Sequence, residues 1–226
     1  MDNWHILYSM PFYLTYLPRL FIGVIIASLG VLISSLALIG VKDIRNSKSP
    51  RVKFVRKFVY FLMKLCLQWE YGYTRSTTQR VNVDYSKYLG KDYTVEWSGA
   101  STIVCNHANW IDSFFVLHKH DAVLTTAEST KHIPVIGRLM QAIGAIFISR
   151  KGDNSYSKDK SSSVLSAIKD HQNLVEDGKS CTPLLMYPEA CACHHQDYLF
   201  EFKIGAFVNL SSIQPVIVKY ETFMGF

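Results

Sequence analysis

The segment STIVCNHANWID, Ser101 to Asp112, decides the fold because its sequence pattern changes from that of a strand to that of a helix. It begins with a short β-branched run, Ser101 to Cys105, which is typical of a buried strand. A polar turn with His107 follows, and a helical pattern runs from Trp110 to about Lys119. The segment therefore predicts a strand, a turn and a helix, which together are a building unit of α/β folds.

The same alternation continues along the rest of the chain. Further strands are expected over Ala122–Ala127, Ala145–Ser149, Leu184–Tyr187 and Pro215–Val218, and helices over Pro134–Ile143 and Val164–Val175, the latter closed by Gly178. The stretch from 73 to 100 predicts turns and edge strands, one of them at Tyr93–Trp97, and the tract 153–163 is expected to be polar and mobile. Residues 73–226 are thus predicted to form an α/β domain with a mixed sheet flanked by helices.

An uncharged apolar stretch, LFIGVIIASLGVLISSLALIGV, extends from Leu20 to Val41. As a helix it is long enough to cross the roughly 30 Å hydrocarbon core of a bilayer. A cleaved signal peptide is disfavoured, because most basic residues follow the stretch rather than precede it. Residues 1–41 are therefore expected to be a membrane anchor. It is either one transmembrane helix or a re-entrant hairpin that includes Ile6–Leu17 and bends at Pro11 and Pro18.

A basic run follows the apolar stretch. Residues 42–72 are expected to form a basic linker and, from Phe58 to Trp69, an apolar segment too short to span, which packs at the interface or on the core. The positive-inside rule places the rest of the chain in the cytosol. The basic residues then either contact anionic headgroups or form a solvated linker; they are Lys42, Arg45, Lys48, Arg51, Lys53, Arg56 and Lys57.

The net charge and the cysteines indicate which kind of partner the protein binds and which cellular compartment it occupies. The net charge of +6 favours a partner rich in phosphate, such as a lipid or a nucleotide, and no nucleic-acid reader motif is present. The five cysteines are scattered, which fits a reducing compartment. The group Cys191, Cys193, His194 and His195 suggests zinc, but a single tight run is poor spacing for a zinc site, so no metal is predicted.

His107 and Asp112 can form a base and its orienting carboxylate, if the histidine lies on the turn and the aspartate in the first turn of the helix. The carboxylate would keep one imidazole nitrogen protonated and leave the other to accept a proton from an alcohol. If the second substrate is a thioester, the activated hydroxyl can attack it directly, because a thiolate leaves easily. Such a reaction needs no nucleophile from the enzyme. The alternative is a histidine at a helix start with a chance aspartate nearby.

Two further clusters follow predicted strands. Arg150 and Lys151 come after the strand at Ala145–Ser149, and the planar guanidinium of an arginine there suits a phosphate. Glu189 comes after the strand at Leu184–Tyr187, where its carboxylate could bind a hydroxyl or orient a basic group. A nucleophilic Cys191, as in a thiol hydrolase, remains a weaker alternative.

Taken in order, these pieces resemble the glycerolipid and lysophospholipid acyltransferase superfamily. Its four motifs are similar to Asn106–His107 through Asp112, Gly144 to Arg150, Tyr187-Pro188-Glu189-Ala190-Cys191, and Pro215 within Ile213–Val218. Residues Leu199–Phe207 and Gln214–Val216 look most like the lysophosphatidylcholine branch. The match covers about residues 100–220.

The resemblance implies a membrane-bound O-acyltransferase that moves a fatty acyl group from acyl-CoA, a co-substrate rather than a cofactor, to a lysophospholipid hydroxyl. His107 would be the general base, Asp112 its partner and Arg150 the ligand of the acceptor phosphate. Glu189 and its neighbours would bind the glycerol backbone, and basic residues such as Lys151 and Lys203 the acyl-CoA. It also implies an endoplasmic reticulum membrane with the catalytic domain facing the cytosol. The sequence leaves protein partners open.

The chain departs from the family pattern at one motif. Ala190 and Cys191 stand where the family has glycine and threonine, and alanine has a Cβ that glycine lacks, while cysteine is a weak hydrogen-bond donor. A catalytically silent membrane scaffold that binds acyl-CoA or lipid is therefore the alternative function. The end at Phe226, shortly after the fourth motif, suggests a short variant or a truncated domain.

Overall fold

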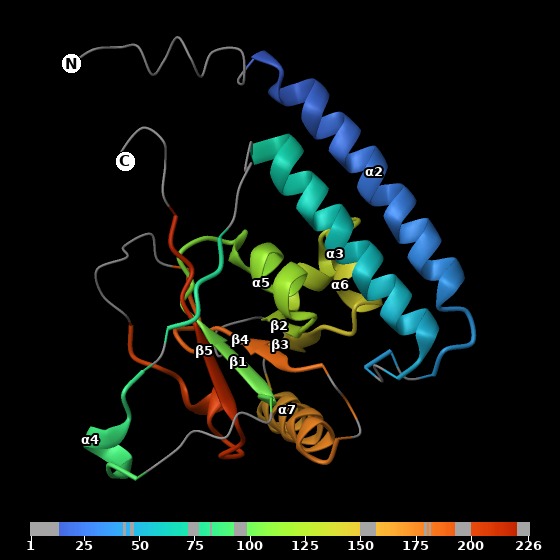
Figure 1. Cartoon of the computed structure of the whole chain (residues 1–226). Helices are drawn as coiled ribbons and strands as arrows, with labels where there is room; N and C mark the ends of the chain where they lie inside the picture. Colours follow the sequence, from blue (N-terminus) through green and yellow to red (C-terminus); the bar gives the residue numbers. More distant parts are fainter. Residues whose placement is uncertain are drawn as a thin grey trace, which may run out of the picture.

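A parallel β-sheet forms the centre of the structure, which is a computed structural model (Figure 1). The structure describes residues 14–42, 44–45, 48–71, 77–81, 83–92, 99–149, 157–178, 180, 182–192 and 200–220. The five strands lie in the order β3-β2-β4-β1-β5. They are β1 (Thr102–Cys105), β2 (Val123–Ala127), β3 (Ile146–Ile148), β4 (Leu184–Met186) and β5 (Ile213–Val216).

The α/β class is confirmed, but the expectation of a mixed sheet is not. Every strand pairing within the described part of the chain is parallel. The reason is that helices follow β1, β2 and β3, and a crossover through a helix returns the chain in the same direction. The alternating stretch Tyr93–Trp97, the expected edge strand, lies outside the described residues. Pro215 is tolerated in β5 because this strand is at the edge of the sheet.

Helices cover both faces of the sheet and make three layers (Figure 1). On one face, Ile103, Cys105 and Leu185 pack with residues of α3 (Pro50–Tyr71), α5 (Asp112–His120) and α6 (Ile136–Ala142). On the other face, Val104, Leu184 and Met186 pack with Ile168 of α7 (Lys158–Glu176). Alternate residues of β1 and β4 therefore enter opposite cores, as the twofold side-chain period of a strand requires. Short helices α4 (Ser86–Leu89), η1 (Glu128–His132) and η2 (Ile204–Ala206) complete the described elements.

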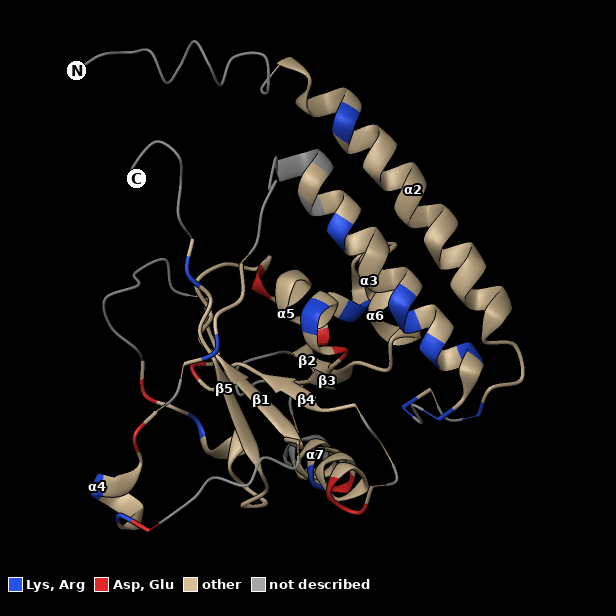
Figure 2. Ribbon diagram, in the orientation of Figure 1, with Lys and Arg blue, Asp and Glu red and all other residues tan. Residues whose placement is uncertain are grey.

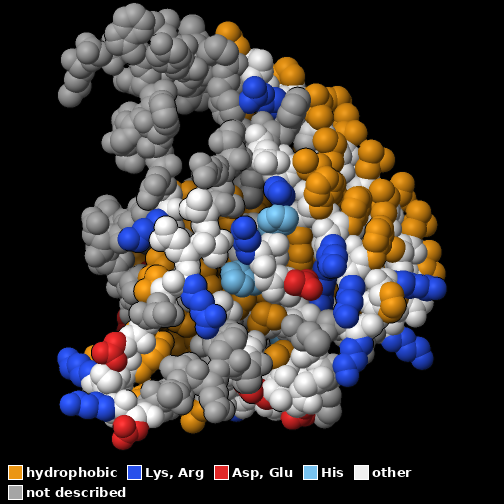
Figure 3. Space-filling view, in the orientation of Figure 1, with side chains coloured by type: hydrophobic (Ala, Val, Ile, Leu, Met, Phe, Trp, Pro, Cys, Tyr) orange, Lys and Arg blue, Asp and Glu red, His pale blue; other side chains and the backbone are white. Residues whose placement is uncertain are grey.

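The apolar N-terminal stretch forms one helix, α2 (Tyr16–Ala37), which is long and apolar enough to cross a membrane by length and composition. It packs along α3 through a narrow face, where Gly30 and Ser34 are buried (Figure 1). Most of its large apolar side chains are exposed, and Figure 3 shows a hydrophobic surface over this helix. Pro18, expected at a bend, lies in the first turn of α2, where a proline removes no helical hydrogen bond. The expected first arm of a hairpin, Ile6–Leu17, lies largely outside the described residues.

Helix α3 begins inside the expected basic linker, at Pro50 rather than Phe58. It packs on the core, with Val52, Val55 and Val59 fully buried. Figure 2 marks several basic residues along this helix. They are not all on its exposed side. Arg56, expected in the basic linker, is 0% exposed. Its guanidinium donates to the carbonyl oxygens of Ile143, Ile44 and Arg45 at 3.3 Å and to Thr182 Oγ1 at 2.7 Å.

Helix α7 also begins earlier than expected, because Lys158 to Ser163 are helical although their polar sequence resembles a loop. Val164, Ile168 and Val175 follow the predicted helical spacing, and Ile168 is almost fully buried. Gly178 lies just past the end of the helix with φ +65°, as expected for a glycine that ends a helix. The apolar period thus located the packed part of α7 but not its first turn.

Arg56 is expected to be a large contributor to stability. Arg56→Leu would remove the donor from two buried and two partly buried oxygen acceptors. This loss costs about 2 kcal/mol or more and lowers Tm by roughly 4–8 °C. Lys53→Leu, an exposed position on the same helix, is the matched control, with a change within about 0.5 kcal/mol. Thermal unfolding of both purified variants in detergent measures this, and equal Tm values would contradict the assignment.

Candidate active site

The loops after β1 and β4 meet at the carboxyl edge of the sheet. β1 pairs directly with β4, with Val104 opposite Met186, so the residues that follow these strands become neighbours. His107 follows β1 and Glu189 follows β4, and the His107 backbone N–H donates to Glu189 Oε1 at 3.3 Å. The first and third sequence motifs are thereby brought together. This edge is where ligands bind in open α/β sheets.

His107 and Asp112 form the predicted pair. His107 Nδ1 lies 3.0 Å from Asp112 Oδ2, and the backbone N–H of Asn109 donates to the same oxygen at 2.8 Å. The hydroxyl of Tyr220 donates to the other oxygen, Oδ1. Asp112 is 0% exposed and is the first residue of α5, where the helix dipole favours a negative charge. An ionised Asp112 fixes the proton of the imidazole on Nδ1 and leaves Nε2 as the basic nitrogen.

The imidazole of His107 is also held from one side. Its ring stacks on the ring of Tyr187, with centroids 4.1 Å apart and 21° between the planes. The Tyr187 hydroxyl is in turn hydrogen-bonded to Ser113 Oγ at 3.0 Å. The His107 side chain is 19% exposed, so the ring is held but not fully enclosed. A base held in this way can accept a proton without first reorienting.

The thiol and phenol beside the pair remain neutral. Burial, and then the charge of Asp112, raises the pKa of the Cys105 thiol to about 12. Burial raises the pKa of Tyr187 well above its usual value, and the nearby Cys105 contributes further. Neither group is therefore a source or acceptor of protons near neutral pH. Among these site residues the imidazole is the group suited to proton transfer.

Glu189 is engaged by backbone groups on both sides. It is 5% exposed, and its Oε1 accepts from the backbone N–H of His107 while Oε2 accepts from that of Phe200 at 3.1 Å. The carboxylate thus connects the loop after β1 to the segment at Phe200. This arrangement gives Glu189 a structural role, and the predicted contact with the glycerol backbone stays a prediction.

The turn after Glu189 contains the departure from the family pattern. Ala190 adopts φ +57°, a left-handed conformation that glycine reaches without strain and alanine does not. Its backbone N–H donates to the carbonyl oxygen of Tyr187 at 3.0 Å, which closes the turn. Cys191 is exposed, and its thiol donates to the Glu189 carbonyl oxygen at 3.4 Å.

Of the three basic residues predicted to bind the substrates, the structure describes only Lys203. The backbone N–H of Lys203 donates to the Pro188 carbonyl oxygen at 2.8 Å, so this residue adjoins the same turn. Its ammonium group is exposed and lies 3.6 Å from Glu201. Arg150 and Lys151 lie outside the described residues. They follow β3, which is separated from β1 by β2 and β4.

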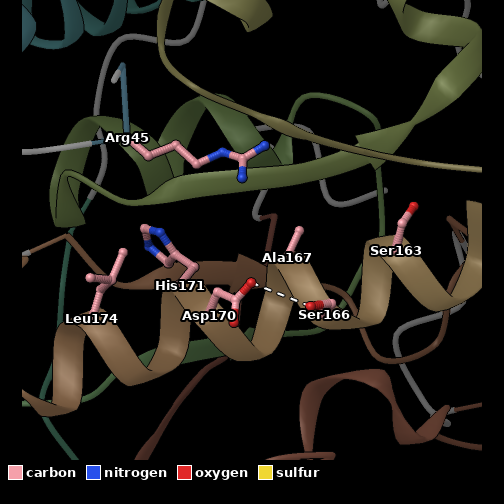
Figure 4. Close-up of a pocket in the computed structure, with 7 residues that line it drawn as sticks. All are labelled: Arg45, Ser163, Ser166, Ala167, Asp170, His171 and Leu174. Atoms are coloured by element: carbon pink, nitrogen blue, oxygen red, sulfur yellow. Dashed lines mark hydrogen bonds between the residues drawn. The ribbon is translucent and has the colours of Figure 1, made fainter. Parts of the chain in front are cut away.

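A cavity of about 340 Å³ lies apart from this site, between Arg45 and α7 (Figure 4). The side chains of Ser166, Asp170 and His171 line it, and Ser166 is hydrogen-bonded to Asp170. It shares no lining residue with the His107 site. In the described ranges no three histidine, cysteine or acidic side chains group closely enough to hold a metal, while Cys193, His194 and His195 lie outside those ranges.

The sequence did not single out Tyr220, nor a role for Asn106 or the Tyr187 ring. Tyr220 is 108 residues from Asp112, so no local spacing relates the two. Only the position of β5 beside β1 brings them together, since Cys105 is opposite Val216. Asn106 lies inside the first motif, but its side-chain amide forms two hydrogen bonds with Val218, beyond β5.

Replacement of Ala190 by glycine is expected to stabilise the protein. Relief of the left-handed strain exceeds the extra entropy of glycine in the unfolded chain, which gives a net gain of about 0.5–1 kcal/mol. Ala192→Gly is the matched control, because Ala192 has no positive φ and should lose stability or stay unchanged. Unfolding midpoints of both variants test this, and a lower Tm for Ala190→Gly would show that the turn is not strained.

The chain is similar to several named lysophospholipid acyltransferases. Lysophospholipid acyltransferase LPEAT1 of Arabidopsis thaliana is 26% identical over 58% of this chain and 32% of its own length. Lysophospholipid acyltransferase LPEAT2 of the same plant is 25% identical over 85% and 32%. Human lysophosphatidylcholine acyltransferase 1 is 26% identical over 50% and 20%. The chain therefore spans a third or less of the length of these relatives, and no solved structure matches it.

The family model described as Acyltransferase matches residues 80–219, more than half of the chain. The matched range contains the sheet, the His107–Asp112 pair and Glu189. The chain thus belongs to the acyltransferase family and is similar to its lysophosphatidylcholine acyltransferase branch.

Proposed function

We propose that the protein is a membrane-bound lysophospholipid acyltransferase that moves a fatty acyl group from acyl-CoA to the free hydroxyl of its acceptor. The observation that carries this proposal is the His107–Asp112 pair, with Nδ1 and Oδ2 3.0 Å apart in a domain of the acyltransferase family. The names of the relatives support lysophosphatidylcholine or another lysophospholipid as the acceptor. The apolar helix α2 supports attachment to a membrane.

In the proposed reaction His107 is the general base. Nε2 takes the proton of the acceptor hydroxyl while the oxygen attacks the thioester carbon. The tetrahedral intermediate then collapses, the C–S bond breaks, and the imidazolium returns the proton to the departing CoA sulfur, so the histidine ends neutral. Asp112 accepts the Nδ1–H throughout and stabilises the transient imidazolium. No covalent enzyme intermediate is needed.

The proposed substrate contacts surround this pair. Arg150 would bind the acceptor phosphate through two parallel hydrogen bonds. Lys151 and Lys203 would attract the phosphates of acyl-CoA, and Glu189, Ala190 and Cys191 would lie along the glycerol backbone. The backbone hydrogen bonds of Glu189 support a role in which it shapes the side of the site that faces the glycerol backbone. They do not suggest that it transfers a proton.

The proposed location follows from the two substrates. A lysophospholipid resides in a membrane and acyl-CoA is water-soluble, so the site must open where both meet. An endoplasmic reticulum membrane with the domain in the cytosol meets this condition. The basic residues that follow α2 support a cytosolic position.

The base role is tested by His107→Ala. Because general-base help is worth factors of about 10²–10⁴, acyl transfer should fall by at least a hundredfold while membrane association is kept. His132→Ala, an exposed histidine of η1, is the control and should keep wild-type activity. The assay uses purified protein in detergent, labelled acyl-CoA, and a panel of lysophospholipids with glycerol 3-phosphate. Full activity of His107→Ala would exclude the mechanism.

The phosphate contact is tested by Arg150→Ala. Loss of a bidentate contact made equally in the ground and transition states should raise the acceptor KM about tenfold or more, with a small change in kcat. The KM for acyl-CoA should stay the same. Arg138→Ala, exposed on α6, is the control. An unchanged acceptor KM in Arg150→Ala would remove this arginine from the phosphate site.

A catalytically silent scaffold is the second candidate function, and the Ala190–Cys191 turn favours it. The Cβ of Ala190 and the weak donor Cys191 replace the glycine and hydroxyl of the family pattern at the wall of the site. The same panel decides between the two. A scaffold would bind acyl-CoA or lysolipid and transfer nothing to any acceptor.

A further inference from the structure

Tyr220 completes the surroundings of the Asp112 carboxylate. Oδ2 is occupied by His107 Nδ1 and the backbone N–H of Asn109, at 3.0 and 2.8 Å, and the Tyr220 hydroxyl donates to Oδ1. Because Asp112 is fully buried, its charge is stabilised by these donors rather than by bulk water. The Tyr220 hydroxyl thus contacts the carboxylate oxygen that does not face His107.

Tyr220 is itself held by the first motif. The side-chain amide of Asn106, the residue before His107, donates to the Val218 carbonyl oxygen at 3.0 Å and accepts from the Val218 N–H at 2.8 Å. This two-sided contact fixes the segment after β5 against the loop after β1. The Tyr220 ring also packs edge-on against Phe115 of α5, with centroids 6.1 Å apart. Its hydroxyl therefore has a defined position relative to α5.

We propose that Tyr220 is a positioning residue of the reaction: its hydroxyl orients the Asp112 carboxylate toward His107, and Asn106 fixes the segment that carries it. This inference rests on the proposed role of His107 as base. Tyr220 acts through Asp112 and does not contact the reacting atoms. The chain beyond β5 thereby contributes to the site although it lies far from the histidine in sequence.

The hydroxyl also sets how strongly Asp112 acts on the imidazole. A hydrogen bond to a carboxylate disperses its negative charge. Without that bond, the charge on Oδ2 stabilises the protonated imidazole more, and His107 keeps its proton to a higher pH. Since only the neutral ring is a base, the rate would then rise at a higher pH. Tyr220→Phe should therefore move the acid limb of the pH–rate profile upward.

The other groups that face the pair do not obscure this effect. Burial raises the pKa of Cys105 to about 12 and that of Tyr187 well above its usual value, so both stay neutral near pH 7. Glu189 faces His107 with a carboxylate that accepts two backbone N–H groups. The histidines of α5, His118 and His120, lie at the end of the helix away from Asp112, and burial is the main cause that lowers the pKa of each.

The experiment compares Tyr220→Phe with wild type in the full chain, because phenylalanine keeps the ring against Phe115 and removes only the hydroxyl. We expect kcat to fall about three- to tenfold, the acceptor KM to stay within twofold, and the acid limb to move up by about half a pH unit. An activity-independent measurement accompanies it. NMR of protein labelled at histidine Cε1, with the His107 signal assigned from His107→Ala, should show the same upward shift in the ring's titration midpoint.

Two further variants distinguish an effect on the position of the Asp112 carboxylate from a general loss of folding stability. Tyr60→Phe removes a buried hydroxyl that donates to the Ala122 carbonyl oxygen at 2.6 Å, away from the site. It should lower Tm without moving the His107 titration. Asn106→Ala should reproduce the titration shift, because Tyr220 loses its support.

An unchanged titration of His107 in Tyr220→Phe would overturn the inference, and so would an equal shift in Tyr60→Phe. The NMR result decides the positioning role even if wild type transfers no acyl group to any acceptor tested. A wild-type protein that transfers no acyl group would reject the proposed function alone, so the failure of the function and the failure of the positioning role are distinguishable.

Discussion

The buried carboxylate of Asp112 is the interaction on which the site depends. A charged group removed from water costs several kcal/mol unless donors surround it. Here those donors come from the loop after β1 and from the segment after β5, at His107, Asn109 and Tyr220. Both segments must therefore fold around α5 for the charge to be tolerated. The requirement that makes the site stable is the same one that aligns the histidine.

Local patterns were enough to predict the parts of the site that are close in sequence. The change from a β-branched run to a helical period around His107 placed the histidine on a turn and Asp112 at a helix start, as observed. The contacts of Asn106 and Tyr220 could not be found in this way, because they span more than a hundred residues. They depend on β5 lying beside β1, and no local pattern specifies the order of strands in a sheet.

Helix boundaries and polar residues were harder to predict for a related reason. The apolar period marks only the part of a helix that packs, so the polar first turn of α7 and the basic first turns of α3 resembled loops. Arg56 shows the limit most clearly. Its charge suggested a surface position, but backbone carbonyl oxygens and Thr182 supply acceptors that make burial possible. Two of those acceptors, Ile143 and Thr182, are 87 and 126 residues away, so no pattern near residue 56 in the sequence indicates them.

The departure at Ala190 is tolerated because the turn around it is fixed from several sides. Tyr187 and Pro188 accept backbone hydrogen bonds from Ala190 and Lys203, and Glu189 holds the amides of His107 and Phe200. A strained residue persists when its surroundings determine its conformation in this way. The chain can therefore keep the shape that a glycine would give at a cost of about 1–2 kcal/mol. Alanine at this position thus affects stability more than the backbone geometry of the site. The Cβ of Ala190 and the thiol of Cys191 instead change the surface that the turn presents to a bound molecule.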